Sequence, residues 1–250
     1  EGACRVCIVE VKGMPHYMAS CSVRVWDGME VQTNSPVIRQ ARRDIVELLL
    51  DNHPKECQTC ERNGNCELQK LAYDMGVRER YYEGRRKHYK IDDSGSAVIR
   101  NPEKCILCGR CVRVCSEIQG VNNLSQHHRG FNTVVGPSNL VPMDDSVCIQ
   151  CGQCINVCPT AAFLETRHTD AIWEALSNPD LHVVVQTAPS IRAAIGEGFG
   201  LPPGTPATEQ MIPALRRLGF SAIFDTNFGA DMTIMEEAHD KVRDAYLDVA

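Results

Sequence analysis

The most informative residues are eight cysteines that form two identical runs with the spacing C-x2-C-x2-C-x3-C. In this pattern, three thiolates from one tight loop bind a cubane cluster, and the fourth binds the neighbouring cluster. Zinc sites instead favour C-x2-C pairs from separate loops. The spacing therefore predicts two 4Fe-4S clusters, one held by Cys105, Cys108, Cys111 and Cys158 and the other by Cys148, Cys151, Cys154 and Cys115.

A second set combines one histidine with three cysteines, in the order His53, Cys57, Cys60 and Cys66. Imidazole and thiolate ligands suit zinc as well as iron-sulfur clusters, so the ligand types alone leave both metals open. The position of the set favours a third 4Fe-4S cluster, because a redox-inert zinc between redox sites would interrupt an electron path. We therefore expect a cluster here, with zinc as the alternative.

A third set, Cys4, Cys7 and Cys21, lies at the start of the sequence. It matches the middle and the end of the plant-type 2Fe-2S pattern, whose first cysteine would precede Glu1. The alternative is a domain that has lost its cluster. We expect a 2Fe-2S domain truncated at its N-terminus, because a strand-rich scaffold with these three cysteines has little other use.

The elements that must position these ligands follow from the apolar pattern. Residues 1–34 alternate apolar and polar side chains, including Val23 and Val25, which predicts strands and hairpins. Ser35-Pro36 predicts the start of a helix of about four turns that leads to His53. Beyond residue 170 the order of strand, helix, strand and helix predicts the opening of an α/β domain with a parallel sheet. The expected segments are 181–185, 208–218, 222–224 and a last helix from about residue 230.

Composition limits the classes of function. The chain has 250 residues, is 43% hydrophobic and carries a net charge of -6, which argues against a general nucleic-acid binder. The basic and aromatic stretch at 78–90 is expected to be a solvated connector. No apolar run approaches the roughly 20 residues that span a bilayer, and the first residues show no signal pattern. We therefore expect a cytoplasmic protein with no membrane span and no nucleic-acid partner.

In their order along the chain, these three sets resemble the N-terminal half of two families. One is the iron-only (FeFe) hydrogenases, and the other is the large iron-sulfur subunit of complex I with its formate dehydrogenase relatives. Residues 186–192, 215–220 and 224–237 are similar to the start of the hydrogenase catalytic domain. A molybdopterin-type protein would instead carry a further cysteine motif. The resemblance therefore favours the hydrogenases.

The resemblance implies an α+β multidomain fold. It places a truncated β-grasp 2Fe-2S domain at 1–34, a helix with the one-histidine three-cysteine 4Fe-4S domain at 35–90, and a two-cluster 4Fe-4S ferredoxin domain at 91–168. The beginning of an α/β catalytic domain follows at 169–250. The cysteines that bind the diiron H-cluster are expected beyond Ala250, so this polypeptide alone is expected to be inactive.

The implied activity is an iron-sulfur electron relay in an anaerobic enzyme that forms and consumes H₂ reversibly. Electrons would be exchanged with ferredoxin or with an NAD(P)H-oxidising flavoprotein subunit. By the same resemblance, Pro189 and Ser190 match the loop beside the diiron centre, and Glu237 matches a glutamate of the proton path. The ordinary alternative for Glu237 is a surface carboxylate on a helix.

Two rival functions remain open from the sequence. A subunit of an NADH dehydrogenase or a formate dehydrogenase would share the cluster ligands but differ after residue 158. A non-enzymatic scaffold or sensor would bind clusters or zinc for structure, and its metal would show no reversible redox titration.

Overall fold

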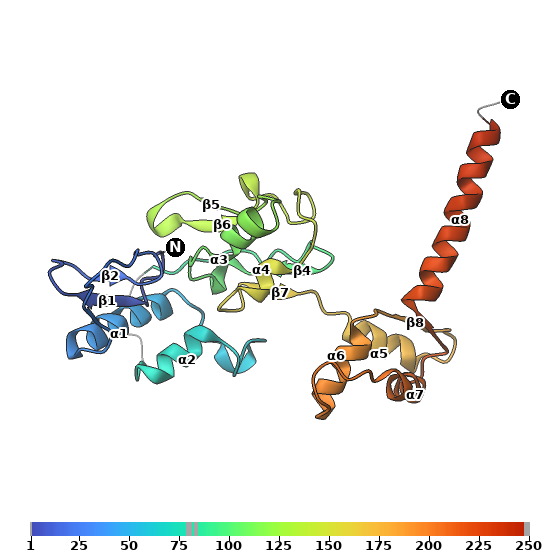
Figure 1. Cartoon of the computed structure of the whole chain (residues 1–250), viewed down its shortest axis with the longest axis horizontal. Helices are drawn as coiled ribbons and strands as arrows, with labels where there is room; N and C mark the ends of the chain where they lie inside the picture. Colours follow the sequence, from blue (N-terminus) through green and yellow to red (C-terminus); the bar gives the residue numbers. More distant parts are fainter. Residues whose placement is uncertain (1, 79–81, 83–84, 248–250) are drawn as a thin grey trace. The chain divides into compact units, whose positions relative to one another are not determined.

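The computed structural model describes residues 2–78, 82 and 85–247, with the backbone alone for 242–247. The chain divides into two compact units, one ending at Thr166 and the other beginning at Arg167 (Figure 1). Part of the basic stretch at 78–90, predicted to be a connector, lies outside the described residues. Within the described ranges, no helix is long and apolar enough to cross a bilayer.

The first unit begins with a small antiparallel sheet that packs on a long helix. The sheet has the spatial order β2-β1-β3, and its strands are β1 (Ile8–Val11), β2 (Met18–Ala19) and β3 (Val31–Gln32). The helix α1 (Pro36–Asp51) starts at the predicted proline, and the Ser35 hydroxyl accepts the Ile38 N–H as its N-cap. The predicted helix is thus confirmed, and the predicted strands are confirmed in part. The stretch around Val25 forms no strand, and this side chain is 87% exposed.

A second helix, α2 (Glu67–Asp74), packs against α1 and fixes the loop between them. The buried core of this contact is formed by Val46, Leu68 and Val77. The loop contains a short 3-10 turn, η1 (Cys57–Thr59). The apolar faces of the two helices therefore hold both ends of the loop that carries the one-histidine three-cysteine set.

The rest of the first unit is built from short elements. These are β4 (Val98–Arg100), η2 (Pro102–Lys104), α3 (Arg110–Arg113), the π-helical turn η3 (Val114–Ile118), β5 (Ser125–His127), η4 (Gly130–Asn132), β6 (Val134–Gly136), η5 (Ser138–Leu140), α4 (Gln153–Asn156) and β7 (Phe163–Glu165). β4 pairs with β7 in an antiparallel ladder with Ile99 opposite Leu164, and β5 pairs in the same sense with β6.

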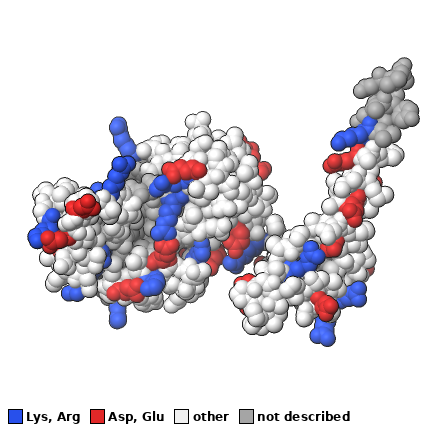
Figure 2. All heavy atoms as spheres, viewed as in Figure 1, with Lys and Arg blue, Asp and Glu red and all other residues white. Residues whose placement is uncertain are grey.

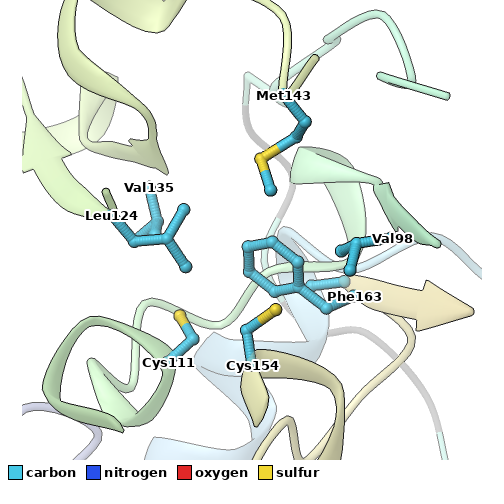
Figure 3. Packing of buried hydrophobic residues seen from close by; sticks show 8 residues of the cluster. Val98, Cys111, Leu124, Val135, Met143, Cys154 and Phe163 are labelled. Carbon is cyan, nitrogen blue, oxygen red and sulfur yellow. The ribbon is translucent and has the colours of Figure 1, made fainter. Parts of the chain in front are cut away.

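One apolar core joins these short elements. Phe163 and Val98, which are 2% and 1% exposed, come from the paired strands β7 and β4. Met143 is 1% exposed and lies against the same group. Figure 3 shows the sulfur atoms of Cys111, on α3, and Cys154, on α4, facing this core. The two four-cysteine runs therefore share a single core.

The second unit contains a two-stranded parallel sheet with helices. Its elements are α5 (Thr169–Ser177), β8 (Val184–Thr187), α6 (Ile191–Ala194), η6 (Ile195–Phe199), α7 (Thr208–Leu218), β9 (Ala222–Asp225) and α8 (Thr226–Leu247). β8 and β9 run parallel, with Val185 opposite Ile223. Gly219 ends α7 with a φ of 107°, a left-handed conformation that glycine adopts without strain. The predicted order of strand, helix, strand and helix with a parallel sheet is confirmed. The first strand lies at 184–187 and not at 181–185, and the last helix starts at Thr226 and not near residue 230.

Candidate iron-sulfur sites

The two four-cysteine runs fold into loops with the same backbone conformation. Leu107 and Gln150, each two residues after the first cysteine of its run, are left-handed with φ values of 56° and 54°. Their backbone N–H groups donate to the Sγ atoms of Cys105 and Cys148, both at 3.4 Å. A left-handed conformation costs a non-glycine residue about 1–2 kcal/mol. The loops are therefore bent at some cost into a shape that presents a donor to sulfur.

Glycine follows at the matching position of each loop. Gly109 precedes α3 with a φ of 78°, and Gly152 precedes α4 with a φ of 73°. This conformation, which a side chain would strain, lets each helix start directly after the loop. The third cysteine of each run, Cys111 or Cys154, then lies on the helix and is buried.

The fourth cysteine of each run lies with the first three of the other run. Cys115 lines one small cavity together with the other three predicted ligands of its set, Cys148, Cys151 and Cys154. In the other set, burial raises the pKa of Cys105 to about 11, and the nearby Cys108 and Cys158 thiols add to the effect. The structure thus brings together the two sets predicted from spacing. Their role as cluster ligands remains a prediction.

These thiols lie in surroundings that disfavour bare thiolates. Burial raises the pKa of Cys154 to about 12 and also raises that of Cys111, and neighbouring thiols raise both further. Several thiolates crowded into one apolar site repel one another, and bound metal supplies the positive charge that offsets this repulsion. The donor set therefore fits iron-sulfur clusters.

The one-histidine three-cysteine set also converges on one small cavity. His53 follows the end of α1 and is 9% exposed, and its backbone N–H donates to the Leu50 carbonyl at 3.2 Å. The cavity is lined by all four predicted ligands, His53, Cys57, Cys60 and Cys66. Burial raises the pKa of Cys57, and the nearby Cys66 and Cys60 thiols raise it further. The donor set fits a cluster here as well. Among the described residues, no three His, Cys, Asp or Glu side chains are arranged to hold a single metal ion.

One residue at this cavity was missed by the sequence reasoning. The Lys104 Nζ lies 3.7 Å from the Cys60 Sγ and 3.2 Å from the Glu61 Oε2. Burial alone would lower the pKa of Lys104, but the hydrogen bond from Lys104 to Glu61 and the charges of Cys60 and Glu61 outweigh it and raise this pKa. The sequence shows that Lys104 directly precedes Cys105, but this position alone does not predict a contact with Cys60, because that contact depends on tertiary folding.

Direct contacts connect this cavity with the segment that carries the two four-cysteine runs. The Cys66 Sγ lies 3.6 Å from the Pro159 carbonyl oxygen, and the Glu67 N–H donates to the same oxygen at 3.0 Å. The Arg62 guanidinium donates to the carbonyl of Cys158 at 3.2 Å. The one-histidine three-cysteine set is therefore in contact with the turn that carries Cys158.

The three cysteines at the start of the chain lie close together. Cys4, Cys7 and Cys21 line one open hollow of about 690 Å³ that Cys108 also lines. The Gly2 N–H donates to the Cys21 Sγ at 3.3 Å. The pKa of Cys21 is lowered, first by a hydrogen bond with Cys7 and then by this N–H. All three cysteines of this set therefore line one hollow, and Cys21 and Cys7 are in hydrogen-bond contact.

These shifts predict an order of thiol reactivity in the metal-free chain. At pH 8 we expect iodoacetamide to label Cys21 first, because its pKa is lowered and its side chain is exposed. Cys111 and Cys154 should react last, because burial raises the pKa of each and limits access. The advantage of Cys21 over Cys105 should shrink as the pH approaches 11. Peptide mass spectrometry after timed labelling measures the order, and equal rates for Cys21 and Cys154 would contradict it.

Ion pairs line the same hollow. The Arg110 guanidinium bonds both carboxylate oxygens of Glu67 at 2.6 and 2.8 Å, and Arg113 pairs with Glu117 at 2.8 Å. The hydrogen bond from Arg110 is the main cause of the lowered pKa of Glu67. Figure 2 shows basic and acidic side chains together in a band over the α3 region of the first unit. Charge at this surface is therefore largely balanced.

In the second unit, Pro189 and Ser190 lie in the turn between β8 and α6, and the Ile191 N–H donates to the Ala188 carbonyl at 3.2 Å. α8 starts at the same edge of the sheet, where the Thr226 hydroxyl donates to the Thr187 carbonyl at 2.7 Å. Glu237 lies eleven residues further along α8, about 16 Å by the rise of a helix, and is exposed. The structure therefore does not bring Glu237 to the Pro189 turn.

Four family models match the chain. They are a 2Fe-2S iron-sulfur cluster binding domain at 1–36, the NADH-ubiquinone oxidoreductase-G iron-sulfur binding region at 42–80, a 4Fe-4S dicluster domain at 104–162, and the iron only hydrogenase large subunit, C-terminal domain, at 181–245. The three segments that contain the predicted ligand sets are thus each matched by an iron-sulfur family.

Individual proteins match over most of the chain. The chain is 49% identical over 236 residues to the NADP-reducing hydrogenase subunit HndD of Solidesulfovibrio fructosivorans, and the match covers 94% of this chain and 40% of that protein. It is 40% identical over 241 residues to iron hydrogenase 1 of Clostridium pasteurianum, covering 96% and 42%. The chain spans about two fifths of the length of these curated relatives.

A solved structure agrees with these matches. A chain of an NAD+-reducing [NiFe]-hydrogenase in the H2-reduced state superposes with a TM-score of 0.61 at 30% identity, covering 66% of this chain and 70% of that one. The protein belongs to the family of multi-cluster iron-sulfur proteins that hydrogenases and complex I share. Its match at 181–245 and its two hydrogenase relatives confirm the predicted resemblance to the iron-only hydrogenases.

Proposed function

We propose that this chain forms the iron-sulfur electron relay of an iron-only hydrogenase. The observation that supports this most directly is the contact between candidate sites, because the Cys66 thiol touches the turn that carries Cys158. When bound, 4Fe-4S and 2Fe-2S clusters supply one-electron carriers whose potentials depend on charge, hydrogen bonds to sulfur and exposure. Adjacent ligand sets allow an electron to pass between such carriers within one protein.

The proposal assigns a ligand set to each cluster. Three 4Fe-4S clusters would be held by the three four-ligand sets given above. Cys4, Cys7 and Cys21 would contribute three ligands to a 2Fe-2S cluster of the full-length protein. This chain contributes the thiols and the imidazole, the backbone N–H groups that donate to the Cys105 and Cys148 sulfurs, and an apolar core around Phe163 that excludes water. Cluster ligation requires these cysteines as thiolates, which favours a reducing compartment such as the cytoplasm.

The activity of the whole protein belongs to the same proposal. It would catalyse 2H⁺ + 2e⁻ ⇌ H₂ at a diiron site, with electrons from ferredoxin or an NAD(P)H-oxidising flavoprotein subunit. The names of the relatives, an NADP-reducing hydrogenase subunit and an iron hydrogenase, support this. Pro189 and Ser190 would lie beside the diiron site and Glu237 in the proton path, and the match at 181–245 is their support. The complex I alternative is less supported, because that segment matches the hydrogenases.

The test is electron paramagnetic resonance of the anaerobically reconstituted, dithionite-reduced chain, with iron, sulfide and zinc measured on the same sample. Three cubanes require roughly twelve irons per chain. Interacting reduced 4Fe-4S signals would support the relay. A silent spectrum with stoichiometric zinc would overturn it in favour of a structural metal protein.

Substitution of His53 tests the third ligand set. Pulsed electron paramagnetic resonance should detect coupling to an imidazole nitrogen in the reduced chain, because His53 lines the cavity with three cysteines. His53→Cys should retain iron but abolish this coupling, because a thiolate replaces the imidazole. His16→Cys is the matched control, since His16 lies outside this cavity, and should leave the coupling intact. Unchanged coupling in His53→Cys would contradict the assignment.

A further inference from the structure

Lys104 lies between two candidate cluster sites. Its Nζ approaches the Cys60 Sγ at 3.7 Å, while the next residue along the chain is Cys105, a predicted ligand of a different cluster. The lysine is 8% exposed and lines the cavity of the one-histidine three-cysteine set. Lysine is rarely this buried unless a specific partner receives its charge. Here the partners are a ligand sulfur and one carboxylate.

The backbone of Lys104 is held by hydrogen bonds to residues of the segment that carries the two four-cysteine runs. Its carbonyl accepts the Thr160 hydroxyl at 2.7 Å, and Thr160 is 1% exposed. Its N–H donates to the Asn101 carbonyl at 3.3 Å, at the end of η2. The side chain therefore reaches Cys60 from an anchored backbone, and its position does not depend on the Cys57–Thr59 turn alone.

The charge of Lys104 is better shielded from water than that of its counterion. The Lys104 side chain is 10% exposed, whereas the Glu61 side chain is 40% exposed. Water therefore screens the carboxylate more than the ammonium. An uneven pair of this kind leaves a net positive field at the Cys60 sulfur.

We propose that Lys104 raises the reduction potential of the cluster held by His53, Cys57, Cys60 and Cys66. This inference rests on the proposed function, because it requires that cluster to be present. One-electron reduction adds one negative charge to the cluster and its ligand sulfurs and breaks no bond at Lys104. A buried ammonium that donates a hydrogen bond to a ligand sulfur stabilises the reduced form more than the oxidised form. Lys104 is thus a positioning residue that acts through Cys60.

The experiment uses the whole reconstituted chain and follows the nitrogen-coupled reduced signal during a dithionite titration with redox mediators. Lys104→Met removes the charge and keeps an unbranched side chain, and it should lower the midpoint potential. We expect the ratio of oxidised to reduced cluster at a fixed potential to rise roughly tenfold, which is about 59 mV for a one-electron couple. Lys104→Arg should restore most of the potential.

Two further variants separate this effect from general charge and folding effects. Lys70→Met removes the same charge from α2, where the Lys70 side chain is 75% exposed, and should leave the potential unchanged. Glu61→Gln removes the counterion and should raise the potential. If Lys104→Met fails to retain iron, Glu61→Gln decides the question, and no upward shift in that variant overturns the proposal.

The outcomes separate this inference from the proposed function. A nitrogen-coupled signal with equal potentials in Lys104→Met, Lys70→Met and the parent chain overturns the role of Lys104 and leaves the relay intact. Absence of the signal from the parent chain overturns the third cluster, and the role of Lys104 with it. A lowered potential that Lys104→Arg restores supports both.

Discussion

Replacing Cys158 with alanine is expected to abolish the reduced 4Fe-4S signal of the cluster predicted at Cys105, Cys108 and Cys111. The reason is that the fourth cysteine of each run lies with the first three of the other run. The Cys158 thiol accordingly contributes to the raised pKa values of Cys105 and Cys108. Loss of one ligand from a cubane should remove up to about four irons per chain. The measurement is electron paramagnetic resonance with iron analysis on the reconstituted variant.

A comparison of variants identifies the cluster that is lost. The spectrum of Cys158→Ala should match that of Cys108→Ala and differ from that of Cys151→Ala, whereas Cys115→Ala should match Cys151→Ala. Ser116→Ala is a control beside Cys115, because its hydroxyl donates to the Val112 and Arg113 carbonyls of its own helical turn, at 3.0 and 3.3 Å. A match between Cys158→Ala and Cys151→Ala would show that each run keeps its own fourth ligand.

The second large effect is expected at the core. Phe163→Ala should lower the free energy of unfolding by about 3–5 kcal/mol, the usual cost of deleting a buried phenylalanine side chain. The ring is 2% exposed and packs among Val98, Met143 and the two cysteines shown in Figure 3. The measurement is the guanidinium concentration at which the visible absorbance of the reconstituted chain bleaches.

Phe131→Ala is the matched control in the same unit. Phe131 is 44% exposed and contacts the Lys87 ammonium, 5.5 Å from its ring centroid. The loss of this ring should lower the free energy of unfolding much less than the loss of Phe163, because a half-exposed ring removes less apolar area from water on folding. Equal bleaching midpoints for the two variants would show that the Phe163 core does not limit cluster retention.

The sequence predicted the ligand sets because their spacing is a local property. A run of four cysteines with a glycine at the bend defines a loop whatever surrounds it, and Gly109 and Gly152 take the left-handed conformation that glycine allows. The helix starting at Pro36 and the parallel pair of strands were also predictable, because capping residues and apolar periodicity act over a few residues. Local signals therefore carried most of the fold.

Contacts between distant segments could not be predicted in this way. Lys104 is 44 residues from Cys60, and its burial depends on where α2 and η2 place the two loops. Similarly, Cys66 is 93 residues from Pro159, and no periodicity marks that carbonyl as its neighbour. Glu237 was assigned to the proton path by resemblance alone. It is exposed on α8, and no local pattern in the sequence indicates its role.

The shared geometry of the two cysteine loops has a consequence for how this segment holds together. Cys115 lies among the cysteines of the second loop, and the Cys158 thiol lies near those of the first. Each half therefore completes the other, in the manner of a domain-swapped dimer joined into one polypeptide. A chain cut between Leu124 and Val134 would yield two pieces with incomplete ligand sets, and each would need the other to rebuild either site.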